Sequence, residues 1–364
     1  MDSTVRERIE WIDATRGLGM ILVFYGHVVN FLIYSDPHAL IQFKLIYSFH
    51  MPMFFVLAGY MSKLPGDGVG AFVRSKARTR LLPAYFFCFL AYAAFALVAL
   101  VQDSDVSWVM EFEHFLPLLY GTPAFNLLTW FLFCLFSVEM LHLALYRTEG
   151  SLLREVAILL AIYSFGSYVA FNHGAITSWI GLSQFPLYGT EALIAYTLFR
   201  LGRLLARTQV AVPGRGRGVS LITAAISLIV VLLLFPRNDG PFSWMEPSVV
   251  MAMMSHGDFV LFPITAVAGT LFIFHTAYLI PASRALRFIG QNSVALLGLN
   301  GILFFLVNQP VAMALSDQMG GSHLRLFVAS GAVAAAELLI CVPIVMLLNR
   351  YLPWALGRSA TSAS

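Results

Sequence analysis

Two ionisable residues in the first apolar stretch of the chain are spaced so that they could act together. Arg16 and His27 lie eleven residues apart. In a helix this spacing is three turns plus about 20°, so both side chains lie on one face, separated by about 16 Å along the axis. A histidine at membrane depth is a functional candidate and suits the task of a general base. We therefore predict a catalytic His27; the alternative is a neutral imidazole that hydrogen-bonds a neighbouring helix.

A group of cations lies on the same predicted side of the membrane as Arg16. Lys76, Arg78 and Arg80 occur within five residues, just before an apolar stretch. Guanidinium groups bind phosphate through paired hydrogen bonds. Together with Arg16, the group predicts a site for a phosphate-rich cytosolic ligand. The alternative is an anchor that only fixes the orientation of the chain in the membrane.

Two further polar residues interrupt apolar runs. His50 precedes Met51-Pro52, which predicts a broken helix end that faces protein or water. Glu139 lies within the run WFLFCLFSVEML, where it could orient a histidine or hydrogen-bond a neighbouring helix. We therefore add His50 and Glu139 to the candidate catalytic residues.

The composition defines the kind of protein that must position these residues. Hydrophobic residues make up 59% of the 364 residues and charged residues only 11%, whereas a soluble domain carries about 25% charge. The chain could not cover a soluble surface with polar groups. This excludes a soluble enzyme, a disordered chain and a nucleic-acid-binding protein, and predicts a polytopic membrane protein.

The predicted fold is an all-α bundle of about ten transmembrane helices with both termini in the cytoplasm. A helix needs about 20 mostly apolar residues to cross a bilayer. The candidate spans are residues 17–35, 45–62, 82–102, 124–145, 153–171, 184–202, 219–236, 258–280, 290–314 and 325–348. With a cytoplasmic start, only Lys44, Arg237 and Arg325 of the 22 lysines and arginines fall in outer segments, as the excess of positive charge on the inner side requires.

We expect a single membrane-embedded domain over residues 1–350, followed by a short cytoplasmic tail over 351–364. No metal-ligand spacing and no phosphate-binding glycine loop occurs in the sequence. We therefore expect no metal and no nucleotide hydrolysis.

Several short motifs together resemble those of the acyltransferase-3 family of membrane acyltransferases. They occur in the family's order over about four-fifths of the chain, and the chain is most similar to the branch of fucose 4-O-acetylases and exopolysaccharide acetyltransferases. The motifs are Ile12-Asp13 with Arg16 and His27, Phe49-His50-Met51-Pro52 leading to Phe54-Phe55-Val56-Leu57-Ala58-Gly59-Tyr60, Arg80-Leu81-Leu82-Pro83, Trp130-Phe131-Leu132 and Gly290-Gln291-Asn292-Ser293. Ala58 departs from the usual Ser-Gly. Asn300 stands where many members carry a histidine, which puts a catalytic role for that position in doubt.

The resemblance implies transfer of an acetyl group from cytosolic acetyl-CoA, as co-substrate, to a sugar hydroxyl. The acceptor would be an exopolysaccharide or lipid-linked oligosaccharide, and the location the bacterial inner membrane, in contact with membrane lipids and without nucleic acid. His27 would be the base or a transient acetyl carrier, and Arg16, Lys76, Arg78 and Arg80 would bind the CoA phosphates. Candidate substrate-binding residues are Asn30, Trp130 and Ser293; Asn30, His50 or Ser293 could donate to the developing oxyanion.

Two other classes of function remain open at this point. A secondary transporter would also have about ten spans, broken helices and buried ionisable residues. A non-catalytic subunit of a polysaccharide export complex would not need the alignment of Arg16 with His27. Acetyl transfer that is lost when His27 is replaced would distinguish the enzyme from both.

Overall fold

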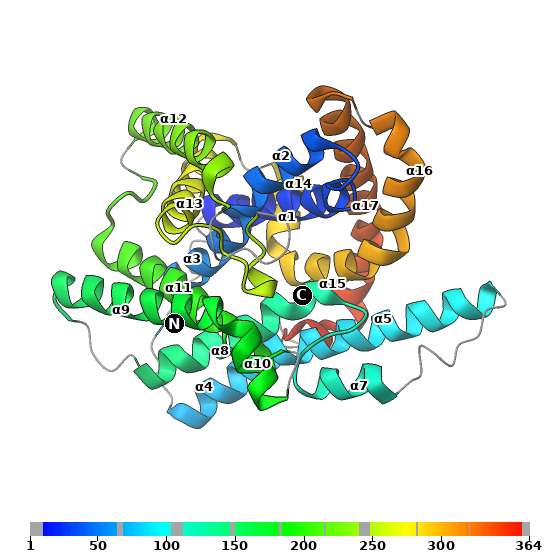
Figure 1. Ribbon diagram of the computed structural model, residues 1–364, viewed down its shortest axis with the longest axis horizontal. Helices are drawn as coiled ribbons and strands as arrows, with labels where there is room; N and C mark the ends of the chain where they lie inside the picture. The colour runs from blue at the N-terminus through cyan, green and yellow to red at the C-terminus, as the bar shows by residue number, and fades with distance from the viewer. Residues whose placement is uncertain are drawn as a thin grey trace, which may run out of the picture.

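A computed structural model describes residues 10–63, 68–102, 112–145, 150–181, 184–214, 216–239, 248–281, 283–319 and 321–358 (Figure 1). Within these ranges the chain is helical, and the only extended pairing is an isolated antiparallel bridge between Val250 and Ser255. The longer helices are α1 (Glu10–Asn30), α2 (Pro37–Tyr47), α3 (His50–Tyr60), α4 (Val69–Lys76), α5 (Leu82–Val101), α7 (Phe112–Leu119), α8 (Trp130–Leu145), α9 (Leu152–Phe171), α10 (His173–Ile180), α11 (Glu191–Thr208), α12 (Arg217–Leu234), α13 (Leu261–Leu279), α14 (Arg284–Gln291), α15 (Ser293–Leu303), α16 (Gln309–Met319) and α17 (His323–Tyr351).

Short helical turns connect several of these helices. Two of them are π-helical and connect the helices on either side without a break. They are η1 (Ala77–Leu81), between α4 and α5, and η6 (Phe304–Asn308), between α15 and α16. The others are 3-10 turns: η2 (Leu127–Thr129), η3 (Pro186–Tyr188), η4 (Phe235–Arg237), η5 (Met251–Met253) and η7 (Pro353–Leu356).

The described part of the chain contains eight helical stretches that are long and apolar enough to cross a membrane: Pro37–Tyr60, Val69–Val101, Leu127–Leu145, Leu152–Phe171, Arg217–Arg237, Leu261–Leu279, Ser293–Ala314 and His323–Tyr351. Each overlaps one of the ten predicted spans. The other two predicted spans fall on α1 and α11, helices of 21 and 18 residues that carry more charge. The predicted all-α membrane bundle is confirmed.

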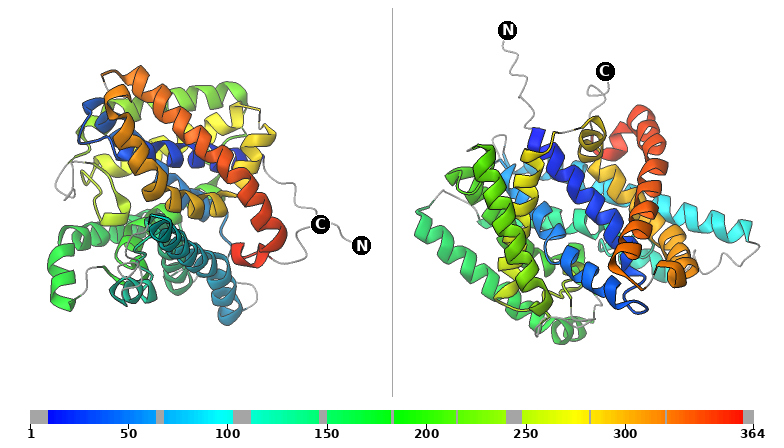
Figure 2. Two further views of the ribbon diagram at one scale, coloured as in Figure 1. Left: turned by 90° about the vertical axis from the view of Figure 1, so that its right-hand side faces the viewer. Right: turned by 90° about the horizontal axis from the view of Figure 1, so that it is seen from above.

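Helix α1 runs through the middle of the bundle. The right-hand view of Figure 2 shows it, in dark blue, passing between α12 and α13 on one side and α16 and α17 on the other. Its neighbours include α2, α3, α13, α14, α15 and α17. It contacts α14 backbone to backbone: a side chain at Gly17 would lie 2.5 Å from the carbonyl oxygen of Leu286. Among the polar residues of α1, Asp13 and Thr15 are buried by these neighbours.

The sixth predicted span begins too early. The sequence suggests a helix over 184–202, whereas α11 begins at Glu191. Leu187 and Tyr188 have positive φ angles of 53° and 54°, which a helix does not tolerate. Pro186 opens the short turn η3 here, and the chain enters the bundle in a non-helical path.

Helices α3 and α11 cross where each has a glycine. A side chain at Gly59 would collide with the backbone of Phe199, and a side chain at Gly202 would lie 2.8 Å from the backbone nitrogen of Tyr60. Small residues allow membrane helices to approach in this way. The close contact fixes α3 beside α11.

We predict that Gly202→Ala destabilises the protein by about 1–3 kcal/mol, because the added methyl group forces the two backbones apart. The Tm of the purified protein in detergent should fall by several degrees. Gly218→Ala in α12 is the matched control, since nothing lies within 4 Å of its added methyl group. An unchanged Tm for Gly202→Ala would contradict the close crossing.

Candidate functional site

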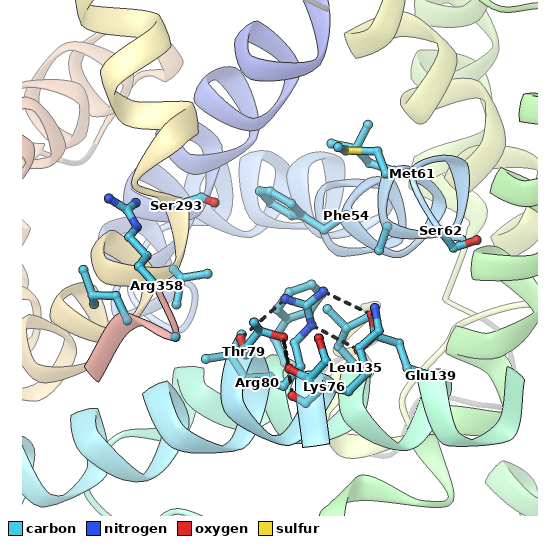
Figure 3. Close-up of a pocket in the computed structure, with 18 of the residues that line it drawn as sticks. Phe54, Met61, Ser62, Lys76, Thr79, Arg80, Leu135, Glu139, Ser293 and Arg358 are labelled. Atoms are coloured by element: carbon cyan, nitrogen blue, oxygen red, sulfur yellow. Dashed lines mark hydrogen bonds and ion pairs between the residues drawn. The ribbon is translucent and has the colours of Figure 1, made fainter. Parts of the chain in front are cut away.

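A cavity of about 680 Å³ opens at the end of the bundle where Arg16 lies; we call this the basic end. Its walls come from α1, α3, α4, η1, α8, the start of α15 and the segment after α17 (Figure 3). Among the described lining residues, five are cations and one is a carboxylate. They are Arg16, Lys63, Lys76, Arg80, Arg358 and Glu139. The cavity therefore favours an anionic ligand.

Glu139 holds two of these cations in place. Lys76 Nζ donates to Glu139 Oε1 at 2.7 Å, and Arg80 donates to both carboxylate oxygens at 3.1 Å (Figure 3). Glu139 is 3% exposed, and a carboxylate buried so deeply needs charged partners. Glu139 thus fixes the orientation of Lys76 and Arg80 on the cavity wall. The structure places it with these cations rather than beside His27 or His50.

The local backbone explains why Lys76 and Arg80 reach the same carboxylate. Lys76 directly precedes the π-helical turn η1, and Arg80 lies within it. A π turn is wider than an α turn and is frequent at functional sites. It brings both side chains onto the face that meets α8.

Arg16 lies across the cavity on α1. One of its guanidinium nitrogens is 3.8 Å from Asp13 Oδ1, and another donates to Met61 Sδ at 3.0 Å. Asp13 in turn accepts from Gln291 Nε2 at 3.1 Å. The side chain of Arg16 keeps 30% of its surface exposed, so it is available to a ligand in the cavity.

A second, much smaller cavity of about 40 Å³ continues the first one inward. The two share Phe54, Phe131, Leu132, Ser293 and Val294 as lining residues. The smaller cavity adds only apolar side chains: Met20, Val23, Met51 and Leu297. It forms a narrow, apolar passage from the basic end toward the centre of the bundle.

The passage follows one face of α1. Arg16, Met20, Val23 and His27 are separated by four, three and four residues, which is the spacing of a single helix face. Arg16 lines the outer cavity, and Met20 and Val23 line the passage. His27 lies one turn beyond Val23. We call these four residues the α1 stripe.

His27 points into the protein rather than toward lipid. Its Nδ1 is 2.5 Å from Asn300 Oδ1, and its ring packs edge-on against Phe304 at 5.3 Å between centroids. Asn300 is fully buried, and its Nδ2 has no hydrogen-bond partner among the described residues. His27 itself is only half-buried.

His50 lies near His27, with Tyr47 beside both rings. The centroid of the Tyr47 ring is 6.5 Å from that of His27 and 4.6 Å from that of His50. The predicted helix break is present, because α2 ends at Tyr47 and α3 begins at His50. The break leaves the carbonyl of Ile46 2.9 Å from His50 Nδ1.

Three other predicted residues lie away from the described cavity walls. Asn30 is the last residue of α1, three residues beyond His27, and is half-buried. Trp130 begins α8, where its ring packs on Phe55 and Tyr188 at 6.2 and 5.8 Å. Arg78 donates through Nη2 to the carbonyl oxygen of Arg358 at 3.1 Å. Ser293, by contrast, lines both the cavity and the passage.

Sequence reasoning did not include Arg358, Lys63 or Asn300 among the site residues. Arg358 falls in the predicted tail, and no local signal connects it to a site. Asn300 had two signals in the sequence: it is an amide at membrane depth, and it stands where many members of the family that the motifs resemble carry a histidine. Within the described residues, no group of three or more His, Cys, Asp or Glu side chains is arranged to hold a metal ion.

Comparison with known proteins gives two kinds of match. The nodulation protein NolL of Mesorhizobium japonicum is 37% identical over 108 residues, which cover 27% of this chain and 28% of that protein. The nodulation protein NolL of Sinorhizobium fredii is 28% identical over 144 residues, which cover 34% of this chain and 38% of that protein. The chain thus matches well under half the length of these relatives. No solved structure matches it.

The second match is to a family. The acyltransferase-3 family model, described as an acyltransferase domain, matches residues 9–346. This range includes the α1 stripe, both histidines and all the cavity helices. Because the match covers nearly the whole chain and the described helices are those of a multi-pass membrane protein, this protein belongs to the acyltransferase-3 family of membrane proteins.

Proposed function

We propose that the protein transfers an acetyl group from cytosolic acetyl-CoA to a sugar hydroxyl of an exopolysaccharide or lipid-linked oligosaccharide in the bacterial inner membrane. The nature of the acceptor comes from the likeness of its motifs to the fucose 4-O-acetylase and exopolysaccharide acetyltransferase branch. The reaction type, acyl transfer, is inferred from membership of the acyltransferase-3 family.

The α1 stripe is the observation that carries the proposal. One helix face runs from a cavity whose charged lining is mostly cationic, along the apolar side chains of Met20 and Val23, to His27 one turn further on. Acetyl-CoA has the same order of chemical groups: a phosphate-rich nucleotide, a long slender arm and a reactive thioester. The nucleotide would occupy the cavity, and the arm would extend along Met20 and Val23.

The charge distribution gives this orientation a physical basis. Arg16, Lys76 and Arg80 would contact the phosphates, with Glu139 holding the last two in position. The positive-inside rule assigns the basic end to the cytosol, where acetyl-CoA is present. The passage in its present form holds little space, so the arm must widen it by moving side chains such as Met20 and Met51.

Direct transfer requires a base beside the thioester. The hydroxyl oxygen bonds to the acetyl carbon while His27 takes the hydroxyl proton; the carbon–sulfur bond then breaks, and the proton passes to the departing thiolate. If Asn300 Oδ1 accepts from His27 Nδ1–H, the lone pair of the imidazole is on Nε2. Asn300 would then be a positioning residue for the base, and His50 or Ser293 a donor to the oxyanion.

We expect His27→Gln to abolish acetylation, because removing a general base costs about a hundredfold or more in rate. A bacterial strain that lacks the gene would be complemented with each variant, and the O-acetyl content of its extracellular and lipid-linked glycans measured. His38→Gln is the control, since His38 is 31% exposed at the start of α2. Wild-type acetylation by His27→Gln, at equal protein level, would refute the role of His27.

We expect Arg80→Ala to raise the KM for acetyl-CoA about tenfold, as loss of a charged hydrogen bond predicts, and to change the acceptor dependence much less. Arg74→Ala is the matched control, because Arg74 is exposed on the preceding helix and does not line the cavity. Both KM values are measured with purified protein and radiolabelled acetyl-CoA. Equal effects on donor and acceptor would argue against a CoA site at Arg80.

We expect Asn300→Leu to lower kcat by at least about tenfold without raising the KM for acetyl-CoA, because the imidazole then loses the acceptor that selects its tautomer. Asn300→Asp keeps an oxygen at the same place and should retain more activity. An unchanged kcat in Asn300→Leu would show that the hydrogen bond to His27 has no part in the reaction.

A further inference from the structure

The chain after α17 returns to the cavity and completes its wall. Tyr351 ends α17, and η7 follows at Pro353–Leu356. Ala355 and Leu356 are buried, at 0% and 7% exposure. Leu356, Gly357 and Arg358 then line the cavity. We call residues 352–358 the C-terminal segment.

The side chain of Arg358 is anchored at three points. Its Nη1 donates to Asn349 Oδ1 at 2.5 Å, and its Nη2 donates to the carbonyl oxygen of Gln291 at 2.9 Å and to Asn292 Oδ1 at 3.1 Å. Asn349 also donates to Asn292 at 2.8 Å, so the acceptors hold one another. These bonds fix the plane of the guanidinium group, on the same side of the cavity as Ser293 (Figure 3).

The backbone of the C-terminal segment is held as firmly. Arg78 Nη2 donates to the carbonyl oxygen of Arg358 at 3.1 Å. Gly357 has a φ of +70°, and any side chain at that position would lie 2.7 Å from the carbonyl oxygen of Arg78. A glycine is therefore required where the segment passes over η1. Arg78 and Gly357 together place Arg358 opposite Lys76 and Arg80.

We propose that Arg358 binds a phosphate group of the acyl donor, and that Arg78 positions it through the backbone carbonyl. The proposal rests on the proposed function, since the ligand is the nucleotide of acyl-CoA. A guanidinium group that is already oriented loses little side-chain entropy when it binds phosphate. Lys76 and Arg80 on one wall and Arg358 on another suit a ligand with two separate phosphate groups, the diphosphate and the ribose 3′-phosphate of coenzyme A.

The experiment is calorimetric titration of the purified full chain with coenzyme A and with dephospho-coenzyme A, which lacks the 3′-phosphate. Arg358→Gln is the main variant, because glutamine keeps N–H donors for the surrounding oxygens but removes the charge. We expect its affinity for coenzyme A to fall about tenfold, and Arg358→Lys to recover part of the loss. Arg350→Ala, an exposed arginine in the last turn of α17, is the control and should bind as the wild type does.

The second probe identifies the phosphate. If Arg358 binds the 3′-phosphate, the variant and the wild type should bind dephospho-coenzyme A equally; if it binds the diphosphate, both ligands should be weakened alike. Either result supports the proposal. The role of Arg358 would be overturned if the Arg358→Gln variant keeps the wild-type Tm and binds both ligands as tightly as the wild type does.

The role of Arg78 has its own readout. Arg78→Ala should weaken binding several-fold, and the double variant Arg78→Ala/Arg358→Gln should be no weaker than Arg358→Gln alone, because both changes act on one contact. Additive losses would overturn the positioning role.

A wild-type protein that binds no coenzyme A and transfers no acetyl group would instead refute the proposed function, and this inference with it.

Discussion

A helix that carries an aspartate, an arginine and a histidine cannot face lipid, and this constraint on α1 shapes the rest of the structure. Asp13 is 2% exposed and reaches both Arg16 and Gln291, while His27 reaches Asn300. Groups of this kind are costly in hydrocarbon unless protein partners surround them. The other helices therefore enclose α1, and α14 approaches it so closely that glycine is needed at Gly17. The polar side chains that force α1 inside are the ones that form the candidate site.

In the cavity, too, a buried charge is stabilised by partners of opposite charge, but here the cations outnumber the carboxylates. Glu139 compensates Lys76 and Arg80, which lets two cations sit side by side at a partly buried wall. Cations still outnumber carboxylates among the described lining residues. This excess of positive charge on the cavity wall favours a multiply charged anion. The passage beyond it adds only apolar side chains, which disfavour such charge.

The sequence predicted the all-α membrane bundle, the acyltransferase family and the helix break before His50, because composition, local motifs and the effect of proline are local properties of the chain. It could not predict which distant residues meet. Glu139 is 63 residues from Lys76, and nothing in its apolar run shows that it pairs with cations instead of a histidine. Arg358 reaches the cavity from a segment that was predicted to be only a short tail. Leu187 and Tyr188 have positive φ angles that their residue types do not predict, so the predicted start of the sixth span was wrong.

We propose that acyl-CoA enters at the basic end and extends along the α1 stripe to His27. A cryo-electron microscopy structure of the protein with coenzyme A bound tests it most directly. We expect the nucleotide among Arg16, Lys76, Arg80 and Arg358, with the sulfur atom beyond Val23 and within reach of the His27 imidazole. A nucleotide at the opposite end of the bundle, or a sulfur atom directed away from α1, would contradict it.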